Sequence, residues 1–151
     1  MNVTVRHMQV SLDQNYNRYT IASYRPGEIV VTIPLNTTEN VVPLHGDQPA
    51  RRHESIQTSM IILPERLIRD WPPTSAAGLT LDDLTPLLDE NIEVMLLGTG
   101  TSLVWPDQML RAQIAQAGIG LEVMDTGAAC RTYNILIADQ RQVAAALILD
   151  R

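Results

Sequence analysis

The sequence contains no lysine, and all eleven of its cationic side chains are arginine. This absence excludes reactions that need a lysine, such as Schiff-base formation with a carbonyl substrate or a phosphate-loop lysine. The formal net charge is −6, so the chain lacks the basic field that usually accompanies binding to nucleic-acid phosphates. We therefore expect no nucleic-acid partner.

Cysteine and long apolar runs are also scarce. Cys130 is the only cysteine, so it cannot form an internal disulfide, and a reducing compartment is the simpler inference. No apolar run approaches the roughly 18 residues that span a bilayer, and the start, MNVTVRHMQV, has neither signal-peptide nor transit-peptide character. These features predict a soluble, cytoplasmic protein without a membrane span, and they leave peripheral membrane association and homo-oligomers open.

The length of 151 residues and the 45% hydrophobic content predict one domain over residues 1–151 that folds without disulfides or structural metal. The stretch WPPTSAAG at residues 71–78 cannot continue a helix or a central strand, because its prolines remove donors and restrict the preceding residue. We therefore expect a strand-rich part at about residues 1–70 and an α/β part at about residues 79–151.

The first part is predicted to contain antiparallel strands. The expected strands are residues 3–10, 19–24, 28–33 and 55–63. Pro26 followed by Gly27 favours a type II turn between the second and third of them. Residues 55–63 are expected to form a single half-buried strand because apolar and polar side chains alternate there. Residues 36–54 are interpreted as a polar connection.

The second part alternates between strand and helix patterns. The expected strands are residues 92–97, 120–124 and 142–149, and the expected helices begin at Thr80 with a capping box, at Pro106-Asp107 and at Thr126. Pro86 is expected to kink or split the first helix, and Gly118 to end the second, whose apolar stripe is Leu110, Ile114 and Ala117. This order predicts an α/β fold with a largely parallel sheet, in which at least residues 92–97 and 120–124 are parallel.

Gly98-Thr99-Gly100 follows an expected strand and precedes a helix, which is where an α/β sheet places a phosphate-binding turn. The dinucleotide fingerprint is incomplete because Leu103 stands where its third glycine would be. The helix is also expected to begin only near Pro106. A nucleotide-binding turn and a tight structural turn both remain, and we favour the structural turn.

Asp125-Thr126-Gly127-Ala128 resembles the Asp-Thr-Gly-Ala loop of aspartic proteases, in which two carboxylates share a proton and activate water. In those enzymes the motif leads into further strand, whereas residues 129–134 here have a helical pattern. We therefore interpret Asp125 as an N-cap whose carboxylate accepts from first-turn N–H groups, and we expect no peptidase activity.

Other nucleophile and ligand candidates are isolated in the sequence. His7, His45 and His53 all lie in the N-terminal half and show no metal-ligand spacing. Cys130 has no histidine near it in sequence and is interpreted as a small buried helical residue. The pattern therefore gives no catalytic residue set, no metal site and no cofactor.

A ligand or partner surface is expected where the Gly98 turn meets the Asp125 helix start, because the carboxyl ends of parallel strands converge at one edge. The residues assigned to it are Gly98, Thr99, Gly100, Asp125 and Thr126, with Arg131, Asn134 and Arg141 as rim contacts. The alternative, which we favour, is that the glycines only make turns and the polar side chains satisfy local backbone and charge.

Five strings in the second part carry a resemblance to a known family. They are LLGTG at 96–100, GIG at 118–120, EVMDT at 122–126, ACRTYN at 129–134 and RQVAAAL at 141–147. Together they resemble a family of small bacterial and archaeal proteins of unknown function that also includes a mitochondrial respiratory complex I assembly factor. The resemblance covers about residues 55–149 and is densest from 98 to 147.

The resemblance implies a three-layer β/β/α fold with a mixed central sheet. It also implies a non-catalytic interaction protein, an assembly factor for a respiratory complex, that works with a protein partner. It supplies no catalytic residue set that could be carried over. The alternative function is a small-ligand-binding protein or an unrecognised enzyme that uses the Gly98 turn and the Asp125 helix start.

Overall fold

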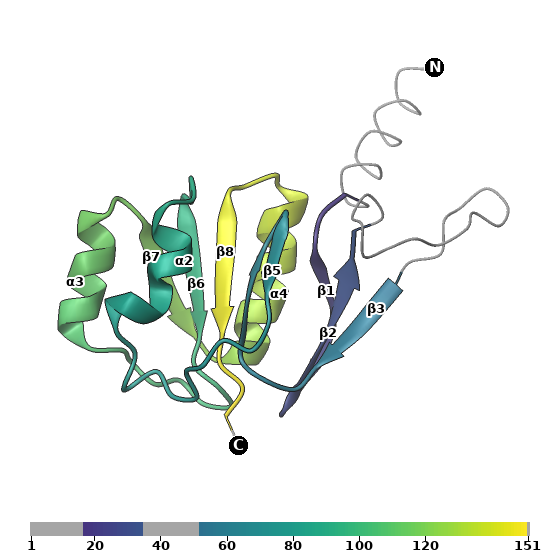
Figure 1. Cartoon of the computed structure of the whole chain (residues 1–151), viewed down its shortest axis with the longest axis horizontal. Coiled ribbons are helices and arrows are strands. Elements are labelled where there is room, and N and C mark those ends of the chain that lie inside the picture. Colours follow the sequence, from purple (N-terminus) through teal and green to yellow (C-terminus); the bar gives the residue numbers. More distant parts are fainter. Residues whose placement is uncertain (1–16, 35–51, 151) are drawn as a thin grey trace, which may run out of the picture.

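The computed structural model describes residues 17–34 and 52–150 (Figure 1). Its elements are β1 (Thr20–Arg25), β2 (Glu28–Ile33), β3 (Arg52–Ile56), β4 (Met60–Leu63), β5 (Arg66–Ile68), the 3₁₀-helix η1 (Leu81–Leu84), α2 (Thr85–Leu88), β6 (Val94–Gly98), α3 (Gln108–Gln116), β7 (Gly120–Met124), α4 (Thr126–Ala138) and β8 (Val143–Leu147). The expected strand at residues 3–10, together with His7 and His45, lies outside the described residues.

The strands form two sheets. A three-stranded antiparallel sheet has the order β1-β2-β3, and a five-stranded sheet has the order β5-β4-β8-β6-β7. In the larger sheet β6 is parallel to both β7 and β8, whereas β4 is antiparallel to β8 and β5. The predicted α/β fold with antiparallel N-terminal strands and a mixed, largely parallel sheet is therefore confirmed.

The β1–β2 hairpin follows the sequence closely. Arg25 and Glu28 pair across its turn, and Gly27 has a φ of +84°, which the third position of a type II turn requires. A glycine at this position avoids the clash that a Cβ would make at positive φ. Pro26-Gly27 is thus the turn that the sequence indicated.

The expected single strand at residues 55–63 is wrong, because these residues belong to two strands in different sheets. Between β3 and β4, Ser59 is buried and bonded to distant segments: its carbonyl accepts from Trp71 N at 2.9 Å and its hydroxyl accepts from Leu149 N at 3.0 Å. These bonds turn the chain from one sheet into the other. The expected polar connection is also too long by three residues, since β3 begins at Arg52.

Two hydrophobic layers cover the five-stranded sheet (Figure 1). Leu96 and Ala145 point to the face that α4 and the three-stranded sheet cover. Met95 and Ala146 point to the opposite face, which η1, α2 and α3 cover. Because both faces are covered, the whole of β8 is buried and reads as a continuous apolar run rather than an alternating one. This arrangement is the three-layer β/β/α fold that the resemblance implied.

The helical segments agree with the sequence in kind and differ in detail. The segment that begins at Thr80 is split, as predicted, into η1 and α2, with Pro86 in the first turn of α2. Asp107 caps α3, which ends before Gly118. Leu110 and Ile114 are buried, but Ala117 is exposed, so the expected stripe on α3 is too long. The strands β6 and β8 are also displaced or shortened by one to two residues relative to the predicted 92–97 and 142–149.

The proline-rich stretch at residues 71–78 is irregular, but the parts on either side of it share one sheet. Strands β4 and β5 precede the stretch and pair with each other, and β4 also pairs with β8, which follows it. The two sheets are also joined by Arg69, whose Nε donates to Glu54 Oε2 at 2.6 Å. This contact holds the pKa of Glu54 below its usual value. Among residues 17–34 and 52–150, no helix combines the length and the apolar character needed to cross a membrane.

Candidate functional site

The turn after β6 and the start of α4 do meet, as the sequence analysis expected. A Cβ added at Gly98 would lie only 2.9 Å from both Cα and Oγ1 of Thr126, and 3.1 Å from Leu147 Cδ2. Thr126 N also donates to Gly100 O at 2.9 Å. The absence of a side chain at Gly98 therefore allows the helix start to lie directly against the end of the central strands.

Thr126 connects three segments at this junction. Its side chain is fully buried, and its Oγ1 accepts from Gly100 N at 2.8 Å while donating to Ile148 O at 2.7 Å. Gly100 follows β6, Ile148 follows β8, and Thr126 begins α4. One hydroxyl thus satisfies a buried donor and a buried acceptor that no strand ladder reaches.

The remaining amides of the Gly98 turn also bond to protein acceptors. Thr99 N donates to Met124 O at 2.9 Å, and Thr101 N donates to both carboxylate oxygens of Asp150, at 3.1 and 3.2 Å. Gly100 has a φ of +106°, and a Cβ there would lie 2.6 Å from the Asp150 carboxylate. Asp150 therefore occupies the place where a phosphate-binding turn would hold its anion, which supports the structural reading of this turn.

Asp125 is the N-cap of α4, as predicted. Its Oδ1 accepts from Ala128 N at 2.9 Å, which satisfies one of the free donors of the first turn. Gly127, two positions further on, lies against Tyr24, because a Cβ added there would lie 2.9 Å from the Tyr24 ring. Burial raises the pKa of the Tyr24 hydroxyl, and the nearby Cys130, Asp150 and Asp125 add to this effect.

Asn134, which was expected at the rim of a binding surface, faces the three-stranded sheet instead. Its Oδ1 accepts from Ile21 N at 3.0 Å and its Nδ2 donates to Ile21 O at 2.7 Å. Strand β1 is an edge of its sheet, so the side-chain amide pairs with Ile21 as the backbone of a neighbouring strand would. Tyr133 supports the same contact, because its hydroxyl donates to Tyr19 O at 2.9 Å.

Replacing Asn134 with alanine is expected to lower the free energy of unfolding by about 2 kcal/mol, because both polar groups of Ile21 lose their partner. Ile135→Ala is the matched control on the same helix: Ile135 is 65% exposed, so a change within about 0.5 kcal/mol is expected. Urea denaturation measures both variants. An Asn134→Ala protein with wild-type stability would contradict a structural role for the contact with Ile21 and would favour the predicted role of Asn134 at the rim of a binding surface.

The two arginines assigned to the same surface differ in position. Arg141 Nε bonds to Glu93 Oε2 at 3.2 Å, beside the start of β6 and thus at the opposite end of that strand from Gly98. Arg131 is exposed on α4 and has no hydrogen bond or ion pair within the described residues. The structure therefore brings Gly98, Thr99, Gly100, Asp125 and Thr126 together, and it does not bring Arg141 to them.

Cys130 and Tyr133 are buried in the α4 interface. Cys130 is 3% exposed, and burial raises the pKa of its thiol to about 12. Burial also raises the pKa of the Tyr133 hydroxyl well above its usual value. Cys130 therefore stays a neutral thiol near pH 7, which is the unreactive form. Within the described residues, no group of three or more histidine, cysteine, aspartate or glutamate side chains is placed to hold a metal ion.

The stability of the protein is expected to fall as the pH rises above about 8.5, where the thiol of an unfolded chain ionises. Over that range the unfolded chain has lost a proton that folded Cys130 still holds, so ionisation favours unfolding. Cys130→Ala should therefore show a smaller fall in its urea midpoint between pH 8 and pH 10 than the wild type. Equal falls in the two proteins would contradict a raised thiol pKa.

A different segment carries the exposed apolar side chains, and the sequence analysis did not single it out. Among the described residues, the large hydrophobic side chains that are well exposed are Leu103 (50%), Trp105 (58%), Met109 (67%) and Ile135 (65%). Three of these four fall within residues 103–109, which form the end of the connection between β6 and α3 and the first turn of α3. The Arg111 guanidinium lies over the Trp105 ring, 5.5 Å from its centre. The sequence signal for this surface was Trp105, which precedes Pro106 and belongs to no helical or strand pattern of apolar residues.

Comparisons with known proteins agree with this architecture. A family model described as a protein of unknown function (DUF498/DUF598) matches residues 45–148. NADH dehydrogenase [ubiquinone] 1 alpha subcomplex assembly factor 3 from Xenopus tropicalis is 33% identical over 89 residues, which are 58% of this chain and 48% of the relative. The chain thus spans about half the length of the curated relatives that it matches.

Solved structures match over most of the chain. A crystal structure of a Bordetella parapertussis protein has a TM-score of 0.68 at 29% identity, and the match covers 88% of this chain and 97% of that one. A Bordetella pertussis protein described as a Mth938-like domain has a TM-score of 0.61 at 27% identity, over 91% and 87% of the two chains.

Proposed function

Because the chain belongs to the family of proteins of unknown function DUF498/DUF598, we propose that it is a non-catalytic interaction protein that acts as an assembly factor for a respiratory complex. The observation that carries this proposal is the 33% identity, over 89 residues, to a protein named as an NADH dehydrogenase assembly factor. A protein partner and a cytoplasmic location are part of the proposal. The single cysteine, buried and expected to remain a thiol, is consistent with a reducing compartment.

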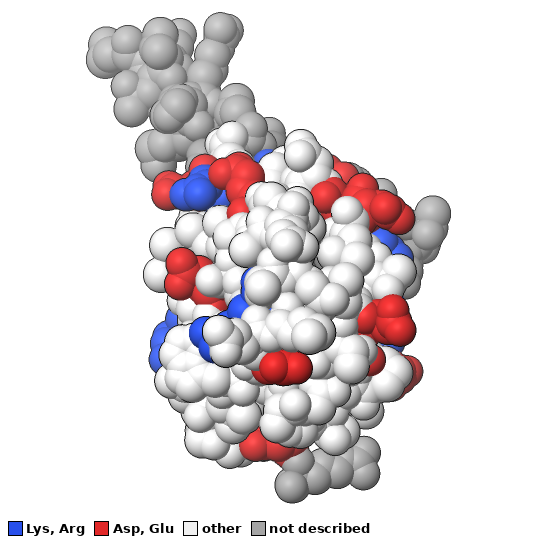
Figure 2. All heavy atoms as spheres, turned by 90° about the vertical axis from the view of Figure 1, so that its left-hand side faces the viewer, with Lys and Arg blue, Asp and Glu red and all other residues white. Residues whose placement is uncertain are grey.

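The surface of the protein gives the proposal a second support. Leu103 and Trp105 are half exposed in the connection between β6 and α3, and tryptophan is among the residues that most often contribute strongly to protein–protein binding. Figure 2 shows the α3 side of the molecule, where residues other than Lys, Arg, Asp and Glu cover most of the surface, with acidic and arginine side chains scattered among them. Such a surface suits a protein partner better than a polyanion.

The hydrogen bonds of the polar groups at the Gly98 turn also support an interaction protein. The hydroxyls of Thr99 and Thr126 bond to backbone groups, and the Asp150 carboxylate bonds to Thr101. Groups that are already paired in this way stabilise the fold and are poorly placed to bind a small ligand. This pairing favours an interaction protein over the alternative of a small-ligand site at the turn.

The proposal is tested by deleting the gene in the native host and measuring the assembled NADH dehydrogenase complex on native gels. We expect the assembled complex to be lost and to be restored by the wild-type chain. A Leu103→Ser/Trp105→Ala variant should fail to restore it while it keeps a wild-type melting temperature, and Ile135→Ser, at an exposed position on α4, should restore it fully. A deletion strain with a normal amount of assembled complex would overturn the proposal.

A further inference from the structure

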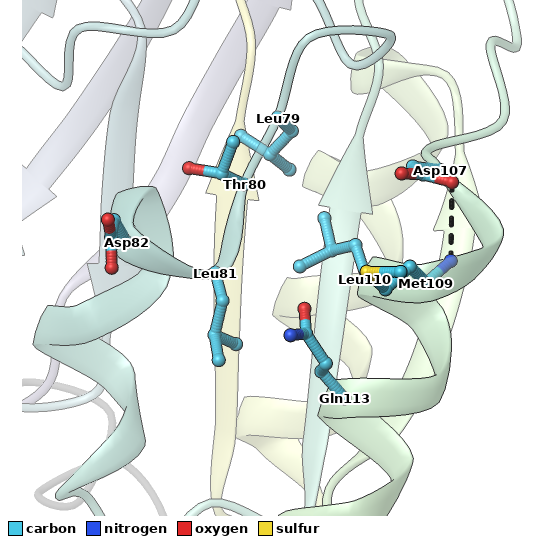
Figure 3. A pocket seen from close by; sticks show the side chains of 8 residues that line it. All are labelled: Leu79, Thr80, Leu81, Asp82, Asp107, Met109, Leu110 and Gln113. Carbon is cyan, nitrogen blue, oxygen red and sulfur yellow. Dashed lines mark hydrogen bonds between the residues drawn. The ribbon is translucent and has the colours of Figure 1, made fainter.

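An open groove of about 340 Å³ lies between η1 and α3 (Figure 3). The residues that line it are Leu79, Thr80, Leu81, Asp82, Asp107, Met109, Leu110 and Gln113. The first four come from the start of η1 and the residues before it, and the last four from α3 and its N-cap. The groove therefore lies on the helical layer, on the opposite side of the five-stranded sheet from α4.

The floor of the groove is apolar. Leu79 and Leu110 are 3% and 2% exposed, so their side chains form a closed base rather than an opening into the core. Leu81 is half-buried, and Met109 is 67% exposed at the side of the groove. Methionine is common at surfaces that bind apolar side chains of varied shape, because its side chain is unbranched and adaptable.

The two charged residues that line the groove are both acidic. Figure 3 shows Asp82 and Asp107 on opposite sides of it, one on η1 and the other at the start of α3. Asp107 Oδ1 accepts from Met109 N at 3.3 Å, a helix-cap contact that involves no cationic side chain. The Asp82 carboxylate has no hydrogen bond or ion pair within the described residues. No arginine or histidine is among the residues that line the groove.

Asp82 and Asp107 share their lack of an ion pair with other exposed carboxylates of the described residues, such as Glu122 and Asp139, and differ in this from four acidic residues that are paired. Glu28, Glu54, Glu90 and Glu93 each form an ion pair with an arginine. With no lysine in the sequence, the chain has only its arginines to balance carboxylates, and none of them lines the groove. A partner that brings its own cations would gain attraction from both sides of the groove as its apolar side chains reach the floor.

We propose that the η1–α3 groove binds a short amphipathic helix of a partner protein, with apolar side chains on Leu79, Leu81 and Leu110 and lysine or arginine side chains toward Asp82 and Asp107. The inference rests on the proposed function and names the partner chemistry that this function requires. Helix-in-groove binding combines an apolar stripe with flanking charges in this way. The opposed carboxylates set the preference for a basic over an acidic partner.

The direct test uses fluorescein-labelled synthetic helical peptides with leucines on one face and lysines on both flanks. One control peptide carries glutamate in place of every lysine, and another carries serine in place of every leucine. Fluorescence polarisation at low salt should show the leucine–lysine peptide binding wild-type protein at least about ten-fold more tightly than either control peptide. Equal binding of the lysine and glutamate peptides would overturn the proposal.

Matched protein variants separate the groove from the overall negative charge. Asp82→Asn/Asp107→Asn, in which asparagine at position 107 preserves the N-cap of α3, should weaken binding of the leucine–lysine peptide about ten-fold. Glu122→Gln/Asp139→Asn removes the same charge from exposed positions outside the groove and should leave binding unchanged. Equal weakening by the two double variants would show that the peptide is attracted by the general negative charge of the protein, and it would overturn the proposal that the groove binds it.

The same variants distinguish a failure of this inference from a failure of the proposed function. Asp82→Asn/Asp107→Asn should fail to restore complex assembly in the deletion strain although its melting temperature is that of the wild type. Full restoration by this variant would refute the groove and leave the assembly function standing. A deletion strain that assembles the complex normally would refute the function, whatever peptide the groove binds.

Discussion

Gly98→Ala is expected to lower the free energy of unfolding by about 3 kcal/mol, since an extra methyl group would meet atoms that cannot move aside. The new Cβ would lie 2.9 Å from the backbone Cα of Thr126 as well as from its hydroxyl. The start of α4 would have to shift away from β6, and the bonds at this junction would lengthen with it. Chemical denaturation of the purified variant measures the loss.

Gly78→Ala is the control for this substitution. An added Cβ at Gly78 meets nothing within 4 Å, and replacing glycine at a compatible position restricts the unfolded chain. We expect its stability to equal or slightly exceed that of the wild type. If Gly98→Ala proved as stable as Gly78→Ala, the close approach of α4 to the end of β6 would not be a feature of the protein in solution.

Thr126→Val is expected to cost about 3 kcal/mol, because it leaves the buried N–H of Gly100 and the buried carbonyl of Ile148 without a partner. Valine has nearly the same shape as threonine, so the loss reports the hydroxyl rather than a cavity. Thr126→Ser keeps both hydrogen bonds and removes only a methyl group, so it should cost about 1 kcal/mol. A valine variant no less stable than the serine variant would exclude the hydroxyl as the link between the three segments.

The sequence predicted the α/β part well because its signals are local. Strand β7 and helix α4 have the predicted bounds, since Gly118 precedes the strand and the Asp125 N-cap begins the helix. The alternation at residues 55–63 was misleading because the two strands within it belong to different sheets. What separates them is the pair of bonds from Ser59 to Trp71 and Leu149, and contacts over that sequence separation leave no local pattern.

The candidate site was predicted in position and not in detail. The convergence of parallel strand ends correctly placed Gly98 beside Thr126, but it could not show that Asp150 fills the turn. Asn134 and Arg141 were grouped by sequence spacing, whereas the tertiary fold assigns one to β1 and the other to the start of β6. The η1–α3 groove joins elements about 25 residues apart, so no period within either element could reveal it.

The position of β8 in the larger sheet affects how the chain can fold as it is synthesised. This strand is the last of the described elements in sequence, yet it lies between β4 and β6 in the middle of the sheet. Until residues 143–147 emerge from the ribosome, β4 and β6 each have one edge unpaired, and nothing joins the β4–β5 hairpin to the β6–β7 pair within that sheet. A nascent chain therefore presents open apolar strand edges to chaperones until β8 has been synthesised, and the sheet closes in a long-range step.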